Sequence, residues 1–214
     1  MPDPGISDTR VAILDAAEQV FADRGFHGAT LRAIAGAGGV NLSLINYHFG
    51  NKEQLFTAAV ERRYDELFAR VSAGVAAAEG RPGASGSDIM RGFLSPILQL
   101  ASTEGAQWRH YLVLLAEGMS VYDVPGIHAS LTRLASVGSL LGDAMKRRAG
   151  AGGDTLRLDI ANYLVEAAII YITQDRGLLD AKTQGRRQAA RVDRILDDMV
   201  VFFSAGYAAL ASSA

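Results

Sequence analysis

The sequence predicts an all-α protein, and three observations on its 214 residues support this class. Alanine, leucine and arginine recur at helical spacing, whereas the alternating pattern of a strand is scarce. Clusters of small residues and glycine interrupt the helical pattern at 79–87 and 149–153, where we expect loops. Hydrophobic residues make up 49% of the chain and charged residues 21%, which is the composition of a folded globular protein.

The periodicity predicts about nine helices in total. Residues 1–8 contain two prolines and are expected to form a flexible arm. Three N-terminal helices are expected over 9–24, 31–37 and 41–49. The remaining helices are expected over 52–75, 88–103, 107–120, 127–149, 154–178 and 187–211. This series predicts a small N-terminal domain of three helices followed by a larger helical domain.

The charge and cysteine content exclude several kinds of protein. The net charge of −2 is not that of a polybasic protein, so any DNA binding must come from a local patch. One such patch lies between Asp23 and Glu53, where Arg24, Arg32 and Lys52 occur without any acidic residue. The absence of cysteine excludes disulfides, thiolate-bound metals and a thiol nucleophile. No signal peptide or membrane span is recognisable, so we expect a cytoplasmic protein. No cofactor is expected.

Residues 9–53 have the plan of a helix-turn-helix domain, because glycine-marked turns join three short helices. Gly25 is expected to end the first helix, and Thr30 and Asn41 are expected to cap the second and third. Gly36 and Gly38 lie within or beside the second helix. A close crossing against another helix is one explanation for Gly36.

The third helix presents two chemically different faces. Ser43, Asn46 and Tyr47 lie three and four residues apart and therefore share one polar face. Ile45 and Phe49 can point the other way, into the core of the small domain. Since an asparagine amide can pair bidentately with adenine, this polar face has the chemistry of a helix that reads the DNA major groove.

The same segment resembles the DNA-binding domain of the TetR (tetracycline repressor) family. The resemblance is carried by Ile13-Leu14-Asp15-Ala16-Ala17, Phe21, Arg24-Gly25-Phe26, Thr30, Ile34-Ala35, Ala37, Gly39-Val40 and the run from Ile45 to Leu55. It implies a regulator of transcription with its DNA reader at 9–53 and a ligand-binding and dimerisation domain at 54–214. The regulator would be a repressor, released from a palindromic operator by a small, mainly apolar effector.

The resemblance also implies which residues contact DNA. Thr30 and Lys52 would hold phosphates at the starts of the second and fourth helices, and the charge pattern adds Arg32 as a candidate. The residues from Asn41 to Tyr47 would face the groove. Nearest the bases would be Leu42, Ser43, Leu44 and Asn46, and Tyr47 and His48 would contact the DNA backbone. The Leu42-Ser43 pair and Asn46 depart from the residues usual in the family, so no relative's operator can be transferred.

The larger domain is interpreted from its helical pattern. The apolar stripes of the helices over 154–178 and 187–211 predict that these helices pack against each other and then against the same pair of a second chain. The resemblance implies the same homodimer. The stripe of the first helix includes Leu156, Ile160, Tyr163, Leu164 and Tyr171. Candidate residues of an effector pocket mix apolar bulk with polar tips: Trp108, His110, Tyr111, Met119, Tyr122, His128, Tyr163 and Tyr171. The alternative for each of these residues is an ordinary position in the core or on the surface, without a contact to an effector.

Two other functions compete with a ligand-responsive regulator. An enzyme is disfavoured because no nucleophile elbow, phosphate-binding loop, dinucleotide fingerprint or zinc motif is present. No metal site is expected, because neither His110 nor His128 has a second ligand at a suitable spacing. A DNA-binding protein without an effector is disfavoured because it has no need of a large domain behind the reader.

Overall fold

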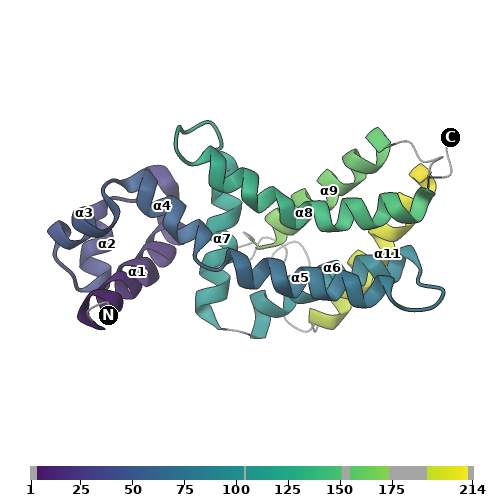
Figure 1. The fold of residues 1–214 in the computed structure, drawn as a ribbon, viewed down its shortest axis with the longest axis horizontal. Coiled ribbons are helices and arrows are strands. Elements are labelled where there is room, and N and C mark those ends of the chain that lie inside the picture. Colours follow the sequence, from purple (N-terminus) through teal and green to yellow (C-terminus); the bar gives the residue numbers. More distant parts are fainter. Residues whose placement is uncertain (1–3, 104, 151–154, 174–191, 212–214) are drawn as a thin grey trace, which may run out of the picture. The chain divides into compact units, whose positions relative to one another are not determined.

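The computed structural model describes residues 4–103, 105–150, 155–173 and 192–211, and every regular element among them is a helix (Figure 1). The prediction of an all-α fold is therefore confirmed. The helices are α1 (Pro4–Gly28), α2 (Leu31–Gly38), α3 (Leu42–Phe49), α4 (Lys52–Glu61), α5 (Tyr64–Glu79), α6 (Gly86–Thr103), α7 (Ala106–Ser120), α8 (His128–Ala149), α9 (Thr155–Thr173) and α11 (Val192–Ala211). Part of the predicted loop at 149–153 and the predicted helix residues 174–178 and 187–191 lie outside the described residues.

The first helix begins earlier than the sequence analysis predicted. Residues 4–8 of the expected arm form the first turns of α1, because a proline in the first turn of a helix loses no hydrogen bond. The predicted end of this helix is confirmed in the backbone angles. Gly25 has a φ of 68° and a ψ of 171°, so it interrupts α1, and the residues up to Gly28 add one further turn.

The fourth predicted helix is in fact two helices, α4 and α5, separated at Arg62 and Arg63. Both arginines reach back to α1. Arg62 donates to Asp15 (2.7 Å) and Glu18 (3.2 Å), and Arg63 donates to Glu18 (3.2 Å). Neither glycine nor proline occurs at the break. The interruption therefore coincides with the side-chain contacts of the two arginines and not with a helix-breaking residue.

The described residues form two compact units. Unit 1 comprises residues up to 65 together with 105–133, and unit 2 comprises 66–104 together with 134–214. In unit 1, α1 packs against α2, α4 and α7. An aromatic cluster lies in its core, with the ring of Phe56 5.0 Å from that of Phe21 and 5.2 Å from that of Phe26. The short helices α2 and α3 are thus carried on a well-packed base.

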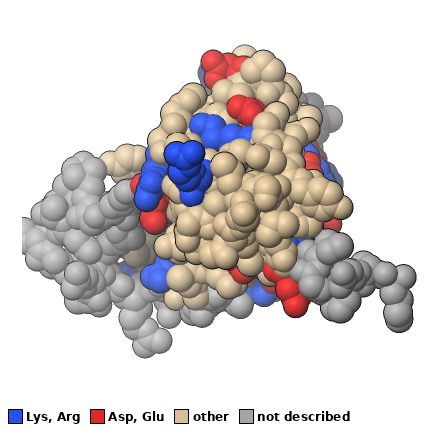
Figure 2. Space-filling view, turned by 90° about the vertical axis from the view of Figure 1, so that its left-hand side faces the viewer, with Lys and Arg blue, Asp and Glu red and all other residues tan. Residues whose placement is uncertain are grey.

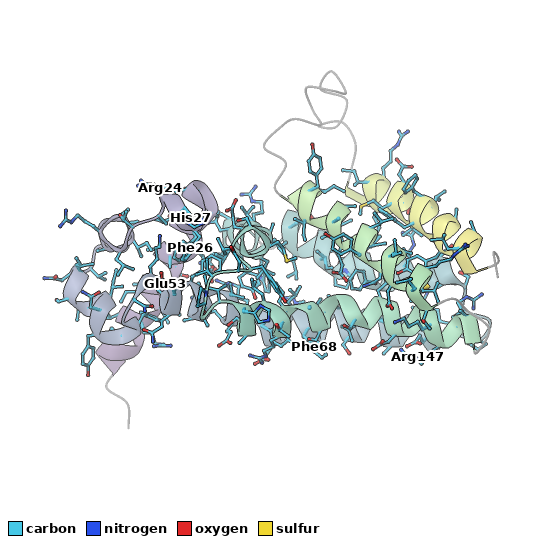
Figure 3. The ribbon with its side chains drawn as sticks, turned by 90° about the horizontal axis from the view of Figure 1, so that it is seen from above. Arg24, Phe26, His27, Glu53, Phe68 and Arg147 are labelled. Carbon is cyan, nitrogen blue, oxygen red and sulfur yellow. The ribbon has the colours of Figure 1, made fainter. Side chains whose placement is uncertain are left out.

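In unit 2, α11 packs against both α6 and α9. An ion pair of 2.6 Å joins Arg91 of α6 to Asp197 of α11. Helices α5 and α6 cross closely at two glycines, because a Cβ on Gly74 would lie only 2.2 Å from the carbonyl oxygen of Gly92. Arg147 of α8, labelled in Figure 3, forms two hydrogen bonds with Glu79 of α5.

Helix α9 buries a different stripe from the one predicted. Its side chains in the core of unit 2 are Leu158, Ala161 and Val165. The predicted packing residues on this helix are largely exposed: Leu156, Ile160, Tyr163, Leu164 and Tyr171. Because α9 is apolar on two faces, the periodicity alone did not distinguish the face that packs within the subunit from the outer face.

Candidate nucleic-acid interface

Side-chain caps hold the two short helices of the candidate DNA reader. Thr30 Oγ1 accepts a hydrogen bond from the backbone N–H of Ala33 (3.1 Å), and Asn41 Oδ1 accepts one from the N–H of Ser43 (3.1 Å). Between these caps, Gly39 ends α2 in the left-handed conformation, with a φ of 62°. Both predicted caps are confirmed, and each satisfies a backbone donor that a helix of only eight residues leaves unpaired at its start.

Helix α3 has the two faces that the sequence predicted. Ile45 and Phe49 are buried. The polar side chains of the other face are exposed, and Tyr47 retains 77% of its accessible surface. The exposed candidate DNA contacts on or beside α3 are Asn41, Ser43, Leu44, Asn46 and Tyr47, while Leu42 and His48 are half-buried. The helix therefore exposes hydrogen-bonding side chains on one face, while Ile45 and Phe49 hold the opposite face in the core.

The ammonium of Lys52 lies in a different place from the one expected of a phosphate clamp. Lys52 Nζ donates to the backbone carbonyls of Phe26 (2.9 Å) and Ala29 (3.3 Å). It also lies 4.3 Å from the centre of the Phe26 ring. Two of its three donors therefore bind the turn that follows the break in α1, and Lys52 joins α4 to that turn within unit 1.

The start of α4 is capped separately from Lys52. Asn51 and Gln54 form a capping box, in which each side chain accepts a hydrogen bond from the backbone N–H of the other residue. This box fixes the turn between α3 and α4. The candidate DNA-binding helix is therefore held at both of its ends by local hydrogen bonds.

The surface around α2 and α3 carries little positive charge. Arg24 and Arg32 are exposed. Figure 2 shows that most of this side of the molecule is neither acidic nor basic and that its Lys and Arg side chains lie in small separate groups. Figure 3 places Arg24 and His27 near the end of α1, together with Phe26 and Glu53. Few cationic side chains are available here to neutralise phosphates, so the affinity of this surface for DNA should depend only moderately on salt.

A buried charged cluster lies behind the reader, within unit 1. Glu18 of α1 is 1% exposed, and its carboxylate is bonded to Arg62 and Arg63. Burial raises the pKa of Glu18, while the two guanidinium groups act in the opposite direction. Arg63 also lies over the ring of Trp108, with its Cζ 5.5 Å from the ring centre. The cluster connects α1, the α4–α5 break and α7.

Trp108 and Tyr111, two of the candidate pocket residues, belong to the packed core of unit 1. Their rings meet edge to face at 5.5 Å. The Tyr111 hydroxyl donates to the backbone carbonyl of Val60 (2.6 Å), and burial raises the pKa of this hydroxyl. Both side chains are therefore engaged by the protein itself, which corrects their interpretation as lining residues.

The other candidate pocket residues are dispersed. His110 borders an open groove in unit 1, of about 390 Å³, between α1, α2 and α7. Tyr122 and His128 contact each other at a ring distance of 4.4 Å. Met119 is exposed, as are Tyr163 and Tyr171 on the outer face of α9. The structure thus brings the candidate set into no single described cavity.

Unit 2 contains a groove that the sequence analysis did not identify. Its volume is about 390 Å³. Its lining residues come from α6, α8, α9 and α11: Gly86, Ser87, Met145, Arg148, Ala149, Leu158, Ser204, Tyr207 and Ala208. Only their proximity in the folded chain relates these residues, so the sequence contained no local signal for the groove.

The described residues contain no group of three or more His, Asp or Glu side chains that would hold a metal ion. None of the described helices is both long enough and apolar enough to cross a membrane.

Two protein-family models match most of the chain. The model described as "Bacterial regulatory proteins, tetR family" matches residues 13–59. The model described as "Tetracyclin repressor-like, C-terminal domain" matches residues 91–206, which is more than half of the chain. The first match covers the helix-turn-helix region, and the second lies in the larger helical part.

Curated relatives share the N-terminal region with this chain. The activator FasR of Mycolicibacterium smegmatis is 38% identical over 64 residues, which are 30% of this chain and 29% of FasR. The repressor AcnR of Corynebacterium efficiens is 43% identical over 51 residues, 24% of this chain and 27% of AcnR. The repressor BepR of Brucella suis is 45% identical over 56 residues, 26% of this chain and 27% of BepR. Each match therefore spans less than a third of the relative's length.

Solved structures share the whole fold at low sequence identity. A TetR-family regulator from Rhodococcus sp. has a TM-score of 0.64 and 20% identity, with 96% of this chain and 100% of that chain covered. AibR, solved with isovaleryl coenzyme A and operator DNA, has a TM-score of 0.66 and 17% identity, with 90% of this chain and 96% of AibR covered. The relatives are regulators and not enzymes. The helix-turn-helix geometry and the two family models together show that this chain belongs to the TetR family of bacterial transcriptional regulators.

Proposed function

We propose that this TetR-family chain is a repressor that leaves a palindromic operator when a small, mainly apolar effector binds. It acts as a homodimer in the bacterial cytoplasm, and each subunit places one α3 in the major groove. The matched relatives include one activator and two repressors, which makes repression the favoured sign of regulation. The effector weakens operator binding because it binds more tightly to the form of the protein that has low affinity for DNA. The coupling free energy between two such sites is typically about 1–3 kcal/mol.

The polar outer face of α3 is the observation that carries the DNA-binding part of the proposal. Asn46 is exposed there between Ser43 and Tyr47, while Ile45 and Phe49 hold the opposite face in the core. A helix of eight residues reads only a few base pairs. Two half-sites about one helical turn apart, read by the two subunits, would supply the remaining affinity.

Selection of bound fragments from the source genome tests this part directly. We expect the parent protein to enrich an inverted repeat. Asn46→Ala should weaken binding to the selected duplex by about 1–3 kcal/mol and broaden the base preference at one position. Ser139→Ala, an exposed position on α8, is the control and should bind like the parent. If Asn46→Ala retains both the affinity and the preference, this face of α3 is not the reader.

The effector part of the proposal is supported by the C-terminal family match and by the groove in unit 2. Met145 and Leu158 are apolar lining residues, while Arg148 and Ser204 are polar ones. Tyr207 also lines the groove, and its hydroxyl donates to Asn162 Oδ1 (3.3 Å). The fold neighbour AibR was solved with isovaleryl coenzyme A, so this acyl thioester and free isovalerate are suitable first probes. The mixture of apolar wall and few polar groups is typical of small-molecule sites.

The sign of regulation can be tested with any probe that raises the melting temperature of the protein. We expect such a probe to lower the affinity for the selected duplex in a fluorescence anisotropy titration. Ala208→Trp, at an exposed lining position of the groove, should abolish both effects without changing DNA binding in the absence of the probe. A probe that stabilises the protein and strengthens operator binding would contradict release by the effector.

A further inference from the structure

The C-terminal end of α3 receives a side chain from α1 that the sequence analysis did not single out. Near this end, the carbonyl of Asn46 accepts from the N–H of Gly50 (2.9 Å), and that of Phe49 accepts from the N–H of Asn51 (3.1 Å). The carbonyl of His48 accepts from Arg10 Nη1 (3.3 Å). Arg10 therefore supplies a donor to a helix end, where backbone carbonyls lack partners within the helix.

A second contact fixes the same guanidinium. The Cζ of Arg10 lies 4.5 Å from the centre of the Phe49 ring, and Phe49 is only 6% exposed. Arg10 thus contacts two consecutive residues: the backbone carbonyl of His48 and the side-chain ring of Phe49. Its positive charge also lies at the C-terminal end of α3, where the helix dipole favours a cation.

Helix α3 is capped at both ends and packs against α2 and α4, but it buries few side chains. These are Ile45 and Phe49, and Phe49 is the ring beneath Arg10. In contrast, α1 packs against three helices of unit 1 and forms its base. The contact from Arg10 therefore joins the short exposed helix to the most firmly packed helix of the unit.

We propose that Arg10 is a positioning residue, which fixes the orientation of α3 against α1 and so determines how well this helix discriminates its operator from other DNA. The inference rests on the proposed function of α3. Since Arg10 acts through His48 and Phe49, its loss reduces binding to the selected sequence and leaves the general attraction to phosphates unchanged. A direct phosphate contact by this exposed arginine is the competing explanation.

The test compares the parent, Arg10→Ala and Arg10→Lys on two duplexes, the one selected by the parent and one of random sequence, across a series of salt concentrations. Arg10→Ala is expected to lose at least about fivefold in affinity for the selected duplex, the lower end of the cost of one lost base contact. Its affinity for the random duplex and its salt slope should equal those of the parent. Arg10→Lys should recover most of the loss, because an ammonium can also donate to His48 and lie over Phe49.

The remaining outcomes overturn the proposal. Equal losses on both duplexes, with the salt slope reduced by about one, would identify a phosphate contact. No loss on either duplex would show that α3 needs no such support. Arg109→Ala, an exposed arginine of α7, controls for the loss of one positive charge. If Arg10→Ala melts below the assay temperature, Arg10→Met replaces it. If the parent protein binds the selected and the random duplex with equal affinity, the proposed function of α3 is wrong, whatever the Arg10 variants do.

Discussion

At the scale of single residues, Lys52 shows how the fold decides the role of a charged side chain. In the sequence it stands at the start of a helix beside a DNA-reading segment, a position suited to a phosphate. In the structure its ammonium binds the carbonyls of Phe26 and Ala29, 26 and 23 residues away. The charge was visible in the sequence, but the partner depends on how α4 packs against the end of α1.

The geometry predicts that Lys52→Ala reduces stability more than DNA affinity. Two charge-assisted hydrogen bonds and a cation–ring contact disappear, so we expect a loss of about 2 kcal/mol in unfolding free energy. The salt dependence of DNA binding should stay that of the parent. Thermal melting and anisotropy titrations at several salt concentrations measure the two effects.

Arg32→Ala provides the contrasting variant. Arg32 is exposed on α2, so its removal should leave the melting temperature nearly unchanged and reduce the salt slope by about one. If Lys52→Ala reduces the slope while melting like the parent, the ammonium leaves the two carbonyls when DNA binds, and the structural role argued for it is wrong.

At the scale of helices, local signals were sufficient for α2 and α3. Thr30 and Asn41 cap the helices that immediately follow them, and Gly39 and Gly50 lie at their ends with positive φ. Caps and turns involve neighbours in the chain, which the sequence displays directly. The exposed face of α3 followed from the three- and four-residue spacing of its polar side chains.

Long-range contacts explain where the prediction of helices was wrong. The break between α4 and α5 accompanies bonds from Arg62 and Arg63 to side chains more than forty residues earlier. The periodicity of α9 did not show which of its two apolar faces packs within unit 2, because that depends on neighbours far away in the sequence. Candidate pocket residues were chosen by type, and the hydroxyl of Tyr111 proved to donate to the backbone carbonyl of Val60, 51 residues earlier. In each case the deciding neighbour is distant in the sequence.

The glycines of α2 and α5 give a matched test of helix packing. A Cβ on Gly74 would lie 2.2 Å from a backbone oxygen of Gly92, so Gly74→Ala must separate α5 from α6. We expect a loss of about 1–3 kcal/mol in unfolding free energy. Gly36 has no atom within 4 Å of its would-be Cβ, so a close crossing does not explain this glycine, and Gly36→Ala should stabilise the helix by up to about 1 kcal/mol.

Calorimetric melting of the two glycine variants measures both changes. The nearby Gly38 differs from Gly36, because its Cβ would lie 3.2 Å from that of Ala16. Gly38→Ala should therefore gain less than Gly36→Ala. Equal melting temperatures for Gly74→Ala and the parent would show that α5 and α6 can separate at little cost, contrary to the crossing described here.

At the scale of the whole molecule, α9 and α11 both expose large apolar side chains to solvent. Helices α9 and α11 pack against each other. Tyr163 of α9 is 65% exposed and Phe202 of α11 is 73% exposed. Apolar patches of this kind, on otherwise folded domains, mark protein interfaces. The two helices are those that the sequence predicted for dimerisation, and the exposed side chains of α9 belong to the stripe on which that prediction was based.

A symmetric dimer through this face predicts a strong effect of Phe202→Glu. In a two-fold interface every substitution occurs twice, so two carboxylates would enter one apolar contact. We expect the variant to sediment as a monomer at concentrations where the parent sediments as a dimer, and to bind a single half-site only weakly. Met119→Glu, at an exposed apolar position on α7, is the matched control and should remain dimeric. If Phe202→Glu has the mass of the parent, the subunits associate through another surface, and the spacing of the two reading helices must be derived from that surface instead.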